Sequence, residues 1–574
     1  MKTHKNSFSC LFITLSLVLS LASSCSKDDR GGCRYPFPPG LTTLDRTLVP
    51  ITVSPFPTLG IHDAAKFDQY GYGRFEYGPG IPCQKRTDLM PAGYTGESVR
   101  QTAELLRFFT MTDVHITDKE SPCQAIVFAP RMGDNAHSCY SPLMLYTTQV
   151  FDAAVQTINK LDDAHAFDLG LALGDLANST QKNELDWFIK IMDGGTIIPS
   201  SGQQKPGTLP DYQQPFTAAG LHSHIPWYAA LGNHDHFWVG SKPMNNKIRN
   251  ALLGTHILQI GWALADSSQM DSTTYTVGTI DGSTKYGDVI GCGRTDTLGV
   301  IPDIAADPER RSLSADEWIA EFRTSNSKPY GHGFVQSNPN NLSGACYSFK
   351  PKSDVPIKII VLDDTQADDD PLAATDGIYG HGELPAARYH WLMDQLQAGQ
   401  DSNELMIIAA HVPIKVAPSG SPFSWIPVPG CYTDENDLVS QLQQFPNLIL
   451  WVSGHRHLNN VTALPSTDPA HPEKGFWEVE TKSIREFPEE FRTYDIVRNS
   501  DNSISIITTD VDADINPGSI AAIGRKYAIA SNQIYKMVPV PLESGSVVYN
   551  AELYKVLTPV MKDRIRNCGK LLNQ

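Results

Sequence analysis

The chain contains five short apolar runs, each of which stops on a side chain that can bind a metal ion or transfer a proton. Buried strands of a parallel sheet are often continuous apolar runs, and functional side chains gather where such strands end. A single run is ambiguous, because Asn-His-Asp after a strand also suits a turn or a helix N-cap. Five runs that end alike give a strong joint signal. They span residues 105–112, 169–173, 227–231, 405–410 and 448–453.

Helix-like segments alternate with these runs. In the first of them Val150, Ala154 and Ile158 fall near one face, as in an amphipathic helix. Strands that alternate with helices predict an α/β core with a largely parallel sheet component. After the last run, segments 477–484, 491–498 and 503–511 alternate like antiparallel strands, and residues 551–565 are predicted to be helical. The helix-like segments are 142–161, 183–192, 385–396 and 437–445.

A length of 574 residues permits two or more domains, or one domain with large insertions. The net charge of −17 argues against a nucleic-acid binder, because binding to phosphate backbones relies on an excess of Lys and Arg. Segment 25–100 is rich in Pro, Gly and Tyr and is predicted to be a tether and an irregular amino-terminal wrap. Segment 237–340 interrupts the alternation and is predicted to be an inserted cap, with a hairpin around 275–290, that shapes a substrate pocket. Residues 516–574 are predicted to form a helical extension packed on the core.

The first residues have the features of an export signal. A basic amino terminus precedes the apolar run 11–21, and small residues then lead to Cys25. The run is short for a membrane helix, which indicates a signal peptide over residues 1–24. A cysteine directly after small residues resembles a bacterial lipoprotein signal, and the acidic segment 26–29 resembles the export tag of surface lipoproteins. We therefore expect an outer-membrane lipoprotein anchored through Cys25 and displayed at the cell surface; the alternative is a free periplasmic protein.

The cysteine count permits disulfides. Ten cysteines become eight if the signal peptide is removed and Cys25 is lipidated, and an even number in an oxidising compartment suits disulfide bonds. The nearest pairs in sequence are Cys33 with Cys83 and Cys123 with Cys139. The sequence does not fix which cysteines pair.

The side chains at the strand ends offer carboxylate, amide and imidazole ligands but no thiolate. This mixture suits two divalent or trivalent ions such as Mn, Fe or Zn that share a carboxylate. Two such ions can hold a bridging hydroxide and bind a phosphoryl oxygen. Taken singly, Asp113 and Asp175 also suit helix N-caps, His411 suits a packed core histidine, and Asn178 suits helix capping. The predicted metal ligands are Asp113, His115, Asp175, Asn233, His411, His455 and His457.

His234 lies beside a predicted ligand rather than in the ligand set. We expect it to donate a proton to the leaving group or to stabilise charge in the transition state, with Asp235 orienting its ring. Arg456, His236 and His332 are candidates for lining the pocket, and the alternative is that they are exposed polar residues of loops.

The five blocks resemble the metal motifs of the calcineurin-like metallophosphoesterase superfamily, in the order that the family has them. They are DVH at 113, GDLAN at 174, GNHD at 232, His411 and GHRH at 454, and they are most similar to those of bacterial members. The resemblance covers residues 101–515, which would be the catalytic domain. It implies a four-layer αββα sandwich with two mixed β-sheets and large insertions between the metal motifs.

The resemblance also implies how the ligands divide between two metal ions. Asp113, His115, Asp175 and His457 would hold one ion, while Asp175, Asn233, His411 and His455 would hold the other, with Asp175 as the bridge. Insertions lengthen the spacing between the first two blocks and between the third and the fourth. A fold and its metal site survive such insertions, but substrate preference does not carry over.

Together these features predict a metal-dependent hydrolase that acts on a small phosphorylated substrate. A metal-bound hydroxide would attack phosphorus directly, and either a phosphomonoester or a phosphodiester would suit the site. The alternative is a surface lipoprotein that binds phosphorylated ligands or glycans without turnover. A serine hydrolase is disfavoured because the chain has no credible GxSxG elbow.

Overall fold

The computed structural model describes residues 37–572 apart from 52–58, 61–62, 125–140, 203–209, 259–274, 277–278, 281–284, 291–292, 295–303, 335–343, 368–379, 415–424 and 535–547. The predicted signal peptide and Cys25 lie outside these residues, so export and lipid anchoring stay predictions. Among the described residues, no helix has both the length and the apolar character needed to cross a bilayer.

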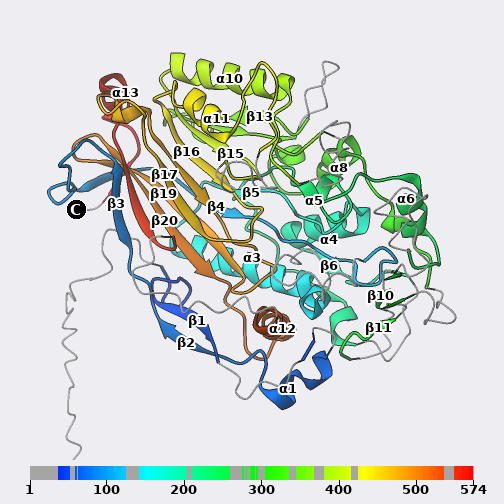
Figure 1. Ribbon diagram of the computed structural model, residues 1–574. Helices are drawn as coiled ribbons and strands as arrows, with labels where there is room; N and C mark the ends of the chain where they lie inside the picture. The colour runs from blue at the N-terminus through cyan, green and yellow to red at the C-terminus, as the bar shows by residue number, and fades with distance from the viewer. Residues whose placement is uncertain are drawn as a thin grey trace, which may run out of the picture.

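The larger of the two main sheets has eight strands and mixes parallel with antiparallel pairs (Figure 1). Seven of its strands follow one another in the spatial order β3 (Gln84–Leu89), β21 (Ala551–Lys555), β20 (Ile504–Asp512), β19 (Glu490–Asn499), β4 (Gln101–Met111), β5 (Leu169–Ala172) and β8 (Trp227–Ala229). The eighth, β22 (Lys570–Leu571), pairs with β4. β4, β5 and β8 are parallel neighbours, so three of the predicted apolar runs end at one edge of this sheet.

The smaller main sheet has six strands and contains the other two predicted runs. In spatial order its strands are β13 (Tyr347–Phe349), β14 (Ile357–Val361), β15 (Leu405–Ala409), β16 (Leu448–Ser453), β18 (Phe476–Glu480) and β17 (Asn460–Leu464). The four central strands, β14, β15, β16 and β18, are parallel, and the two outer strands are antiparallel to their neighbours.

Helices cover the outer faces of the two sheets (Figure 1). Ile407 of β15 joins the core shared with the larger sheet, whereas the next residue, Ile408, points the other way and packs in one cluster with Leu392 of a covering helix. Across the larger sheet, Phe188 of α4 contacts Trp227 of β8. The covering helices are α10 (Ala386–Asp401) and α11 (Glu435–Leu442) on the smaller sheet, and α3 (Thr147–Ala164), α4 (Lys182–Asp193) and α12 (Ile520–Ile534) on the other side.

These layers confirm the four-layer αββα sandwich with two mixed sheets. Strands buried on both faces must be apolar at every position, which is why the predicted runs were continuous. Every residue of β5, β15 and β16 is buried. Burying one large apolar side chain contributes about 1.5–3 kcal/mol, so these strands fix the position of whatever follows them.

One secondary-structure prediction was wrong, and a second was right only in part. Residues 551–555 form strand β21 rather than the start of a helix, because Leu553 packs in the core while Glu552 accepts hydrogen bonds from Gln101 and Ser505 on the other face. The helix begins only at α13 (Pro559–Ile565). The antiparallel prediction for the segment from Trp477 holds on one side only, because β18 runs antiparallel to β17 but parallel to β16.

The amino-terminal segment is more regular than the predicted wrap. Strands β1 (Arg46–Pro50) and β2 (Phe75–Pro79) form an antiparallel pair, and β3 is the edge strand of the larger sheet. Both β3 and β21 lie outside residues 101–515, so the sheet that carries three of the motifs also includes strands from the two flanking segments.

The insertion at 237–340 is joined to the core by a buried ion pair. Arg310 donates from Nε to Asp118 Oδ2 at 3.1 Å, and both side chains are at most 1% exposed. Asp118 follows the first motif by three residues, so the insertion touches the loop that leaves it. The insertion contains α6 (Asn246–Leu253), α8 (Ala315–Glu321) and the short antiparallel pairs β9 (Tyr275–Thr276) with β12 (Gly293–Arg294) and β10 (Thr279–Ile280) with β11 (Val289–Ile290).

The described cysteines give a partial view of the disulfides. Cys83 is in a disulfide bond, whereas Cys123 is a free, buried thiol. Cys33 and Cys139 lie outside the described residues.

Candidate metal centre

The predicted ligands meet at the ends of five strands that belong to both sheets. β4, β5 and β8 of the larger sheet lead to the first three motifs, and β15 and β16 of the smaller sheet lead to the last two. The seven side chains are buried or nearly so, although they are polar. Buried polar groups need hydrogen bonds or ions to offset their loss of water. The contacts of these side chains therefore decide what the cluster can bind.

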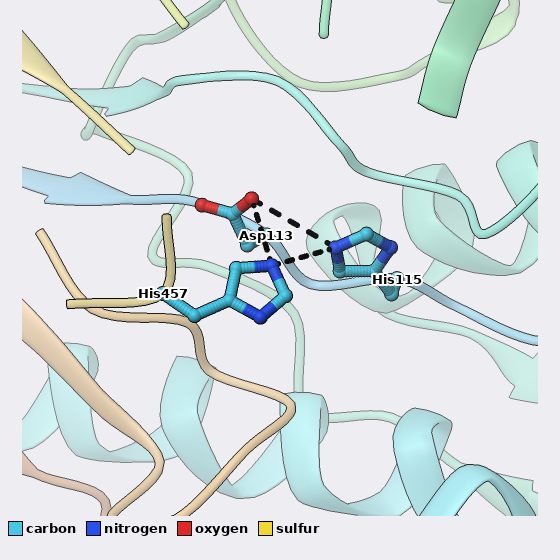
Figure 2. A group of neighbouring side chains, drawn as sticks. All are labelled: Asp113, His115 and His457. Atoms are coloured by element: carbon cyan, nitrogen blue, oxygen red, sulfur yellow. Dashed lines mark hydrogen bonds and ion pairs between the residues drawn. The ribbon is translucent and has the colours of Figure 1, made fainter. Parts of the chain in front are cut away.

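One group consists of Asp113, His115 and His457 (Figure 2). The Nε2 atoms of the two histidines lie 3.1 Å apart, and His457 Nε2 is 3.2 Å from Asp113 Oδ1. His115 Nε2 lies 3.8 Å from the same carboxylate oxygen. Asp113 Oδ1 is buried and has no hydrogen-bond partner. The Asp113 oxygen and the two histidine nitrogens thus lie close enough together to bind one ion.

A second group surrounds the amide oxygen of Asn233. Asn233 Oδ1 lies 2.9 Å from His411 Nε2 and 3.1 Å from His455 Nδ1, and these two nitrogens are 3.3 Å apart. Asp175 Oδ2 lies 3.3 Å from His411 Nε2 and 3.6 Å from His115 Nε2. The Asp175 carboxylate therefore lies between the two groups, as expected for a shared ligand.

The hydrogen bonds on the far side of the rings show that these contacts need a cation. His411 Nδ1 lies 2.8 Å from the Leu173 carbonyl oxygen, which can only accept a hydrogen bond, so Nδ1 carries the proton. In the neutral ring, Nε2 then directs its lone pair at the oxygens of Asn233 and Asp175. Such a contact is repulsive unless a metal ion lies between the atoms or the ring is protonated.

The charges of the protein's own residues also favour positive charge at these two groups. Burial lowers the pKa of His411, but the charge of Asp175 and its hydrogen bond overcome this effect and raise the pKa to about 10. Burial likewise lowers the pKa of His457, and Glu486 and Asp113 raise it to about 10. Positive charge is therefore favoured at one histidine of each group, while burial lowers the pKa of the other two, His115 and His455, to about 3. Metal–ligand bonds of about 2.0–2.2 Å place neighbouring ligand atoms about 3–3.5 Å apart, close to the distances seen here.

Five of the seven ligands have a backbone conformation that is uncommon for residues other than glycine. Their φ angles lie between 45° and 75°, in the left-handed region. Each such residue costs on the order of 1 kcal/mol, and such outliers cluster at functional sites. The conformation turns the chain where a strand ends. The five are Asp113, His115, Asp175, His455 and His457.

Two glycines of the motifs leave room for this convergence. A Cβ atom on Gly232 would lie 2.2 Å from the Asp175 Oδ1 atom, and one on Gly454 would lie 2.5 Å from Asp113 Oδ2. Both distances are far shorter than van der Waals contact. The glycines therefore permit the loops to approach the carboxylates.

His234 lies beside the cluster, as predicted, but its ring is oriented by a residue other than Asp235. The ring contacts that of His115, with centroids 4.4 Å apart, and a ring nitrogen lies within 4.8 Å of ligand atoms of His115 and Asp175. His234 Nδ1 is 2.7 Å from the carbonyl oxygen of Asn178. This contact places the Nδ1 proton and fixes the ring.

Asp235 was expected to orient the His234 ring, and this prediction was wrong. Its Oδ1 accepts hydrogen bonds from the backbone N–H groups of Leu176 and Ala177, and its Oδ2 accepts from Gly232. The carboxylate therefore ties the loop after β5 to the loop after β8. Asp235 can position the site through the backbone, while the carbonyl group of Asn178 orients the ring.

A sixth loop, which the five motifs did not reveal, supports the centre. Residues 481–486, which follow β18, contact three of the motif loops. Ser483 Oγ donates to the Asp113 carbonyl, Arg485 Nη1 donates to Asn178 Oδ1, and Glu486 Oε1 lies 3.1 Å from His457 Nδ1. A sixth strand end at the same edge was the available signal. The alternating pattern from Trp477 onward concealed it, because that pattern is typical of antiparallel strands.

Replacing Glu486 with alanine is expected to weaken metal binding at the group formed by Asp113, His115 and His457. A carboxylate behind a ligating histidine fixes its tautomer and orientation, and its loss typically costs 10–100-fold in affinity. Glu486→Gln should lose less, because its amide oxygen can still accept the Nδ1 proton. Equilibrium dialysis against Mn²⁺ measures the change.

A matched control for Glu486→Ala is Glu473→Ala. Glu473 Oε1 also contacts a histidine Nδ1, that of His471 at 2.9 Å, but this pair lies on the surface. Equal metal affinity in Glu486→Ala and Glu473→Ala would show that Glu486 does not support the site.

The three pocket candidates occupy different places. His332 is buried, stacks on Trp227 with centroids 3.4 Å apart and lies 2.9 Å from its carbonyl oxygen, so it packs against β8 rather than lining the site. Arg456 forms a bidentate ion pair with Glu480 beside the last motif. His236 is partly buried and lies near Thr365.

Comparisons with solved structures show a distant likeness in fold. The chain matches no protein-family model and no curated protein. It is similar to the crystal structure of a dimetal phosphatase from Danio rerio, with 10% sequence identity and a TM-score of 0.35, over 71% of this chain and 97% of that chain. Because this TM-score is low, the function proposed below is based on the side chains alone.

Proposed function

We propose that the protein is a metal-dependent hydrolase of phosphoric esters with a dinuclear centre. The observation that carries this proposal is the position of Asp175, whose Oδ2 atom faces His115 on one side and His411 on the other. One ion would be held by Asp113, His115, Asp175 and His457, and the other by Asp175, Asn233, His411 and His455. This ligand set suits Mn, Fe or Zn.

The protein's own residues would have two roles, which are to hold the metal ions and to transfer a proton. When bound, two such ions supply positive charge at the phosphoryl group and lower the pKa of a water molecule that can act as the nucleophile. The turns after the strands hold the ligands in place before substrate arrives, which is the basis of electrostatic preorganisation. The buried surroundings strengthen these interactions, because the local dielectric constant is low.

His234 is the residue best placed to donate a proton to the leaving oxygen. Its Nδ1 proton is held by the Asn178 carbonyl, which leaves Nε2 as the atom that can gain and release a second proton. Burial lowers the pKa of His234, and the nearby Asp175 carboxylate opposes this effect. Such a donor assists both monoesters and diesters whose leaving groups are poor.

Removing and restoring the metal ions tests the proposal. We expect the full chain to lose hydrolysis of aryl phosphates when it is treated with a chelator and to regain it with Mn²⁺, Fe²⁺ or Zn²⁺. A panel of aryl monoesters and diesters, nucleotides, sugar phosphates and phospholipid headgroups would then identify the substrate class. Binding of phosphorylated ligands by a metal-loaded protein that hydrolyses none of them would instead support the alternative, a binding protein without turnover.

A further inference from the structure

A second cluster of potential ligands lies at the opposite end of β8 from the metal centre. His222 and His224 precede β8, whereas Asn233 follows it. His222 Nδ1 and His224 Nε2 each lie 2.8 Å from the same oxygen, Oδ2 of Asp162, which is in the last turn of α3. All three ligand atoms lie within 4.8 Å of one another. The cluster shares no residue with the dinuclear centre.

The Asp162 carboxylate is buried, and the described residues around it include no permanently charged cation. Its side chain is only 2% exposed, while those of His222 and His224 are 32% and 59% exposed. Its other oxygen, Oδ1, accepts a hydrogen bond from the backbone N–H of Phe167. Among the residues that the structure describes, its ion-pair partners are these two histidines and no Lys or Arg. A buried carboxylate without a permanently charged partner is costly, and a metal ion bound by Asp162 and the two imidazoles would neutralise it.

Another buried cluster shows how the fold otherwise neutralises such a carboxylate. Glu104, His165 and Asp495 also place three potential ligand atoms close together. There, however, Arg107 Nη1 lies 2.8 Å from Asp495 Oδ1, so a permanent cation is already present. The Asp162 cluster lacks this arginine among the described residues, and its histidines open to solvent instead.

The loop that carries the two histidines is fixed to α3 independently of any ligand. Asn159 accepts a hydrogen bond from the His222 backbone N–H at 2.9 Å and donates to the Gly220 carbonyl at 2.8 Å. Gly220 has a φ of 74°, which turns the loop. Asn159 and Asp162 are three residues apart on one face of α3. Asn159 therefore fixes the loop to the helix, and Asp162 places its carboxylate beside the imidazoles of that loop.

We propose that Asp162, His222 and His224 form a mononuclear site for a divalent transition-metal ion of the zinc class. Two imidazoles and one carboxylate suit Zn²⁺, and three protein ligands leave a position that water can fill. Bonds of about 2.0–2.2 Å require ligand atoms about 3 Å apart, close to the 2.8 Å contacts seen here. The ion would neutralise Asp162 and join the loop before β8 to the end of α3.

Counting bound zinc tests this site without reference to activity. The full chain is stripped with a chelator, dialysed to equilibrium against buffered Zn²⁺ and measured for zinc per chain by elemental analysis. The wild type is expected to bind one more ion per chain than the double variant His222→Ala/His224→Ala. Asp162→Asn should lose the same ion, and circular dichroism shows whether this buried substitution leaves the fold intact.

His471→Ala is the matched control for the zinc count. His471 is also exposed and contacts a carboxylate, that of Glu473, but it is in none of the described clusters of three ligands. We expect His471→Ala to bind as much zinc as the wild type. Equal zinc in the wild type and the His222/His224 double variant would overturn the proposal. The comparison is a difference, so it holds whether or not the dinuclear centre binds zinc and hydrolyses esters.

Discussion

Replacing Asp175 with asparagine is expected to lower hydrolysis of phosphoric esters by about a thousandfold or more. Asp175 faces both ligand groups, and its Oδ1 also accepts the His234 backbone N–H at 2.8 Å. Asparagine keeps the shape and that hydrogen bond but removes the shared negative charge. Metal ions stabilise charge in the transition state by several kcal/mol, and each 1.4 kcal/mol is a tenfold change in rate. Initial rates with an aryl phosphate at saturating Mn²⁺ measure the loss.

Metal content separates this effect from a general loss of structure. Asp175→Asn is expected to bind less metal per chain than the wild type while its circular dichroism spectrum stays the same. Asp152→Asn serves as a matched control, because Asp152 is a buried carboxylate on α3 that contacts Ala219 and Gln156 and no residue of the centre. If Asp175→Asn retained both full metal content and wild-type rate, a dinuclear hydrolase that shares Asp175 would be ruled out.

The cluster of candidate metal ligands was predictable because it depends on features that are local in sequence. β15 is apolar throughout and leads directly to His411, and β16 leads to His455 and His457. A run of buried residues identifies the strand, and parallel strands bring their carboxyl ends to one edge. The members of the candidate cluster could therefore be identified from short motifs. The left-handed backbone that directs the side chains was not visible in the sequence, since none of the five ligands that adopt it is a glycine.

The remaining features depend on contacts between distant segments. Glu486 reaches His457 because β18 lies next to β16, and neither the pairing nor its parallel direction is visible in the alternating residues of β18. Residues 551–555 have a helix-compatible composition, but hydrogen bonding to β20 and β3 makes them a strand. Tertiary context routinely overrides local propensity in this way. The role of Asp235 was misjudged for the same reason, because two of its partners, Leu176 and Ala177, lie in the preceding motif loop.

Replacing His234 with alanine is expected to slow hydrolysis by about 10²–10⁴-fold, the usual contribution of a general acid. The loss should depend on the leaving group. An alkyl phosphate has a poor leaving group that needs a proton, whereas an electron-poor aryl phosphate leaves readily as an anion. We therefore expect a large loss with alkyl esters and a small one with activated aryl esters. Rates for a series of esters with different leaving-group pKa values measure this dependence in the wild type and the variant.

Metal content and a distant histidine complete the test of His234. Because the ligand sets proposed for the two ions do not include His234, His234→Ala should retain the metal content of the wild type. His390→Ala, which removes an exposed histidine from α10 on the outer face of the smaller sheet, should leave both the rate and the leaving-group dependence unchanged. An equal loss with alkyl and aryl esters would mean that His234 stabilises charge on the phosphoryl group and donates no proton. Reduced metal content would instead make His234 part of the ligand sphere.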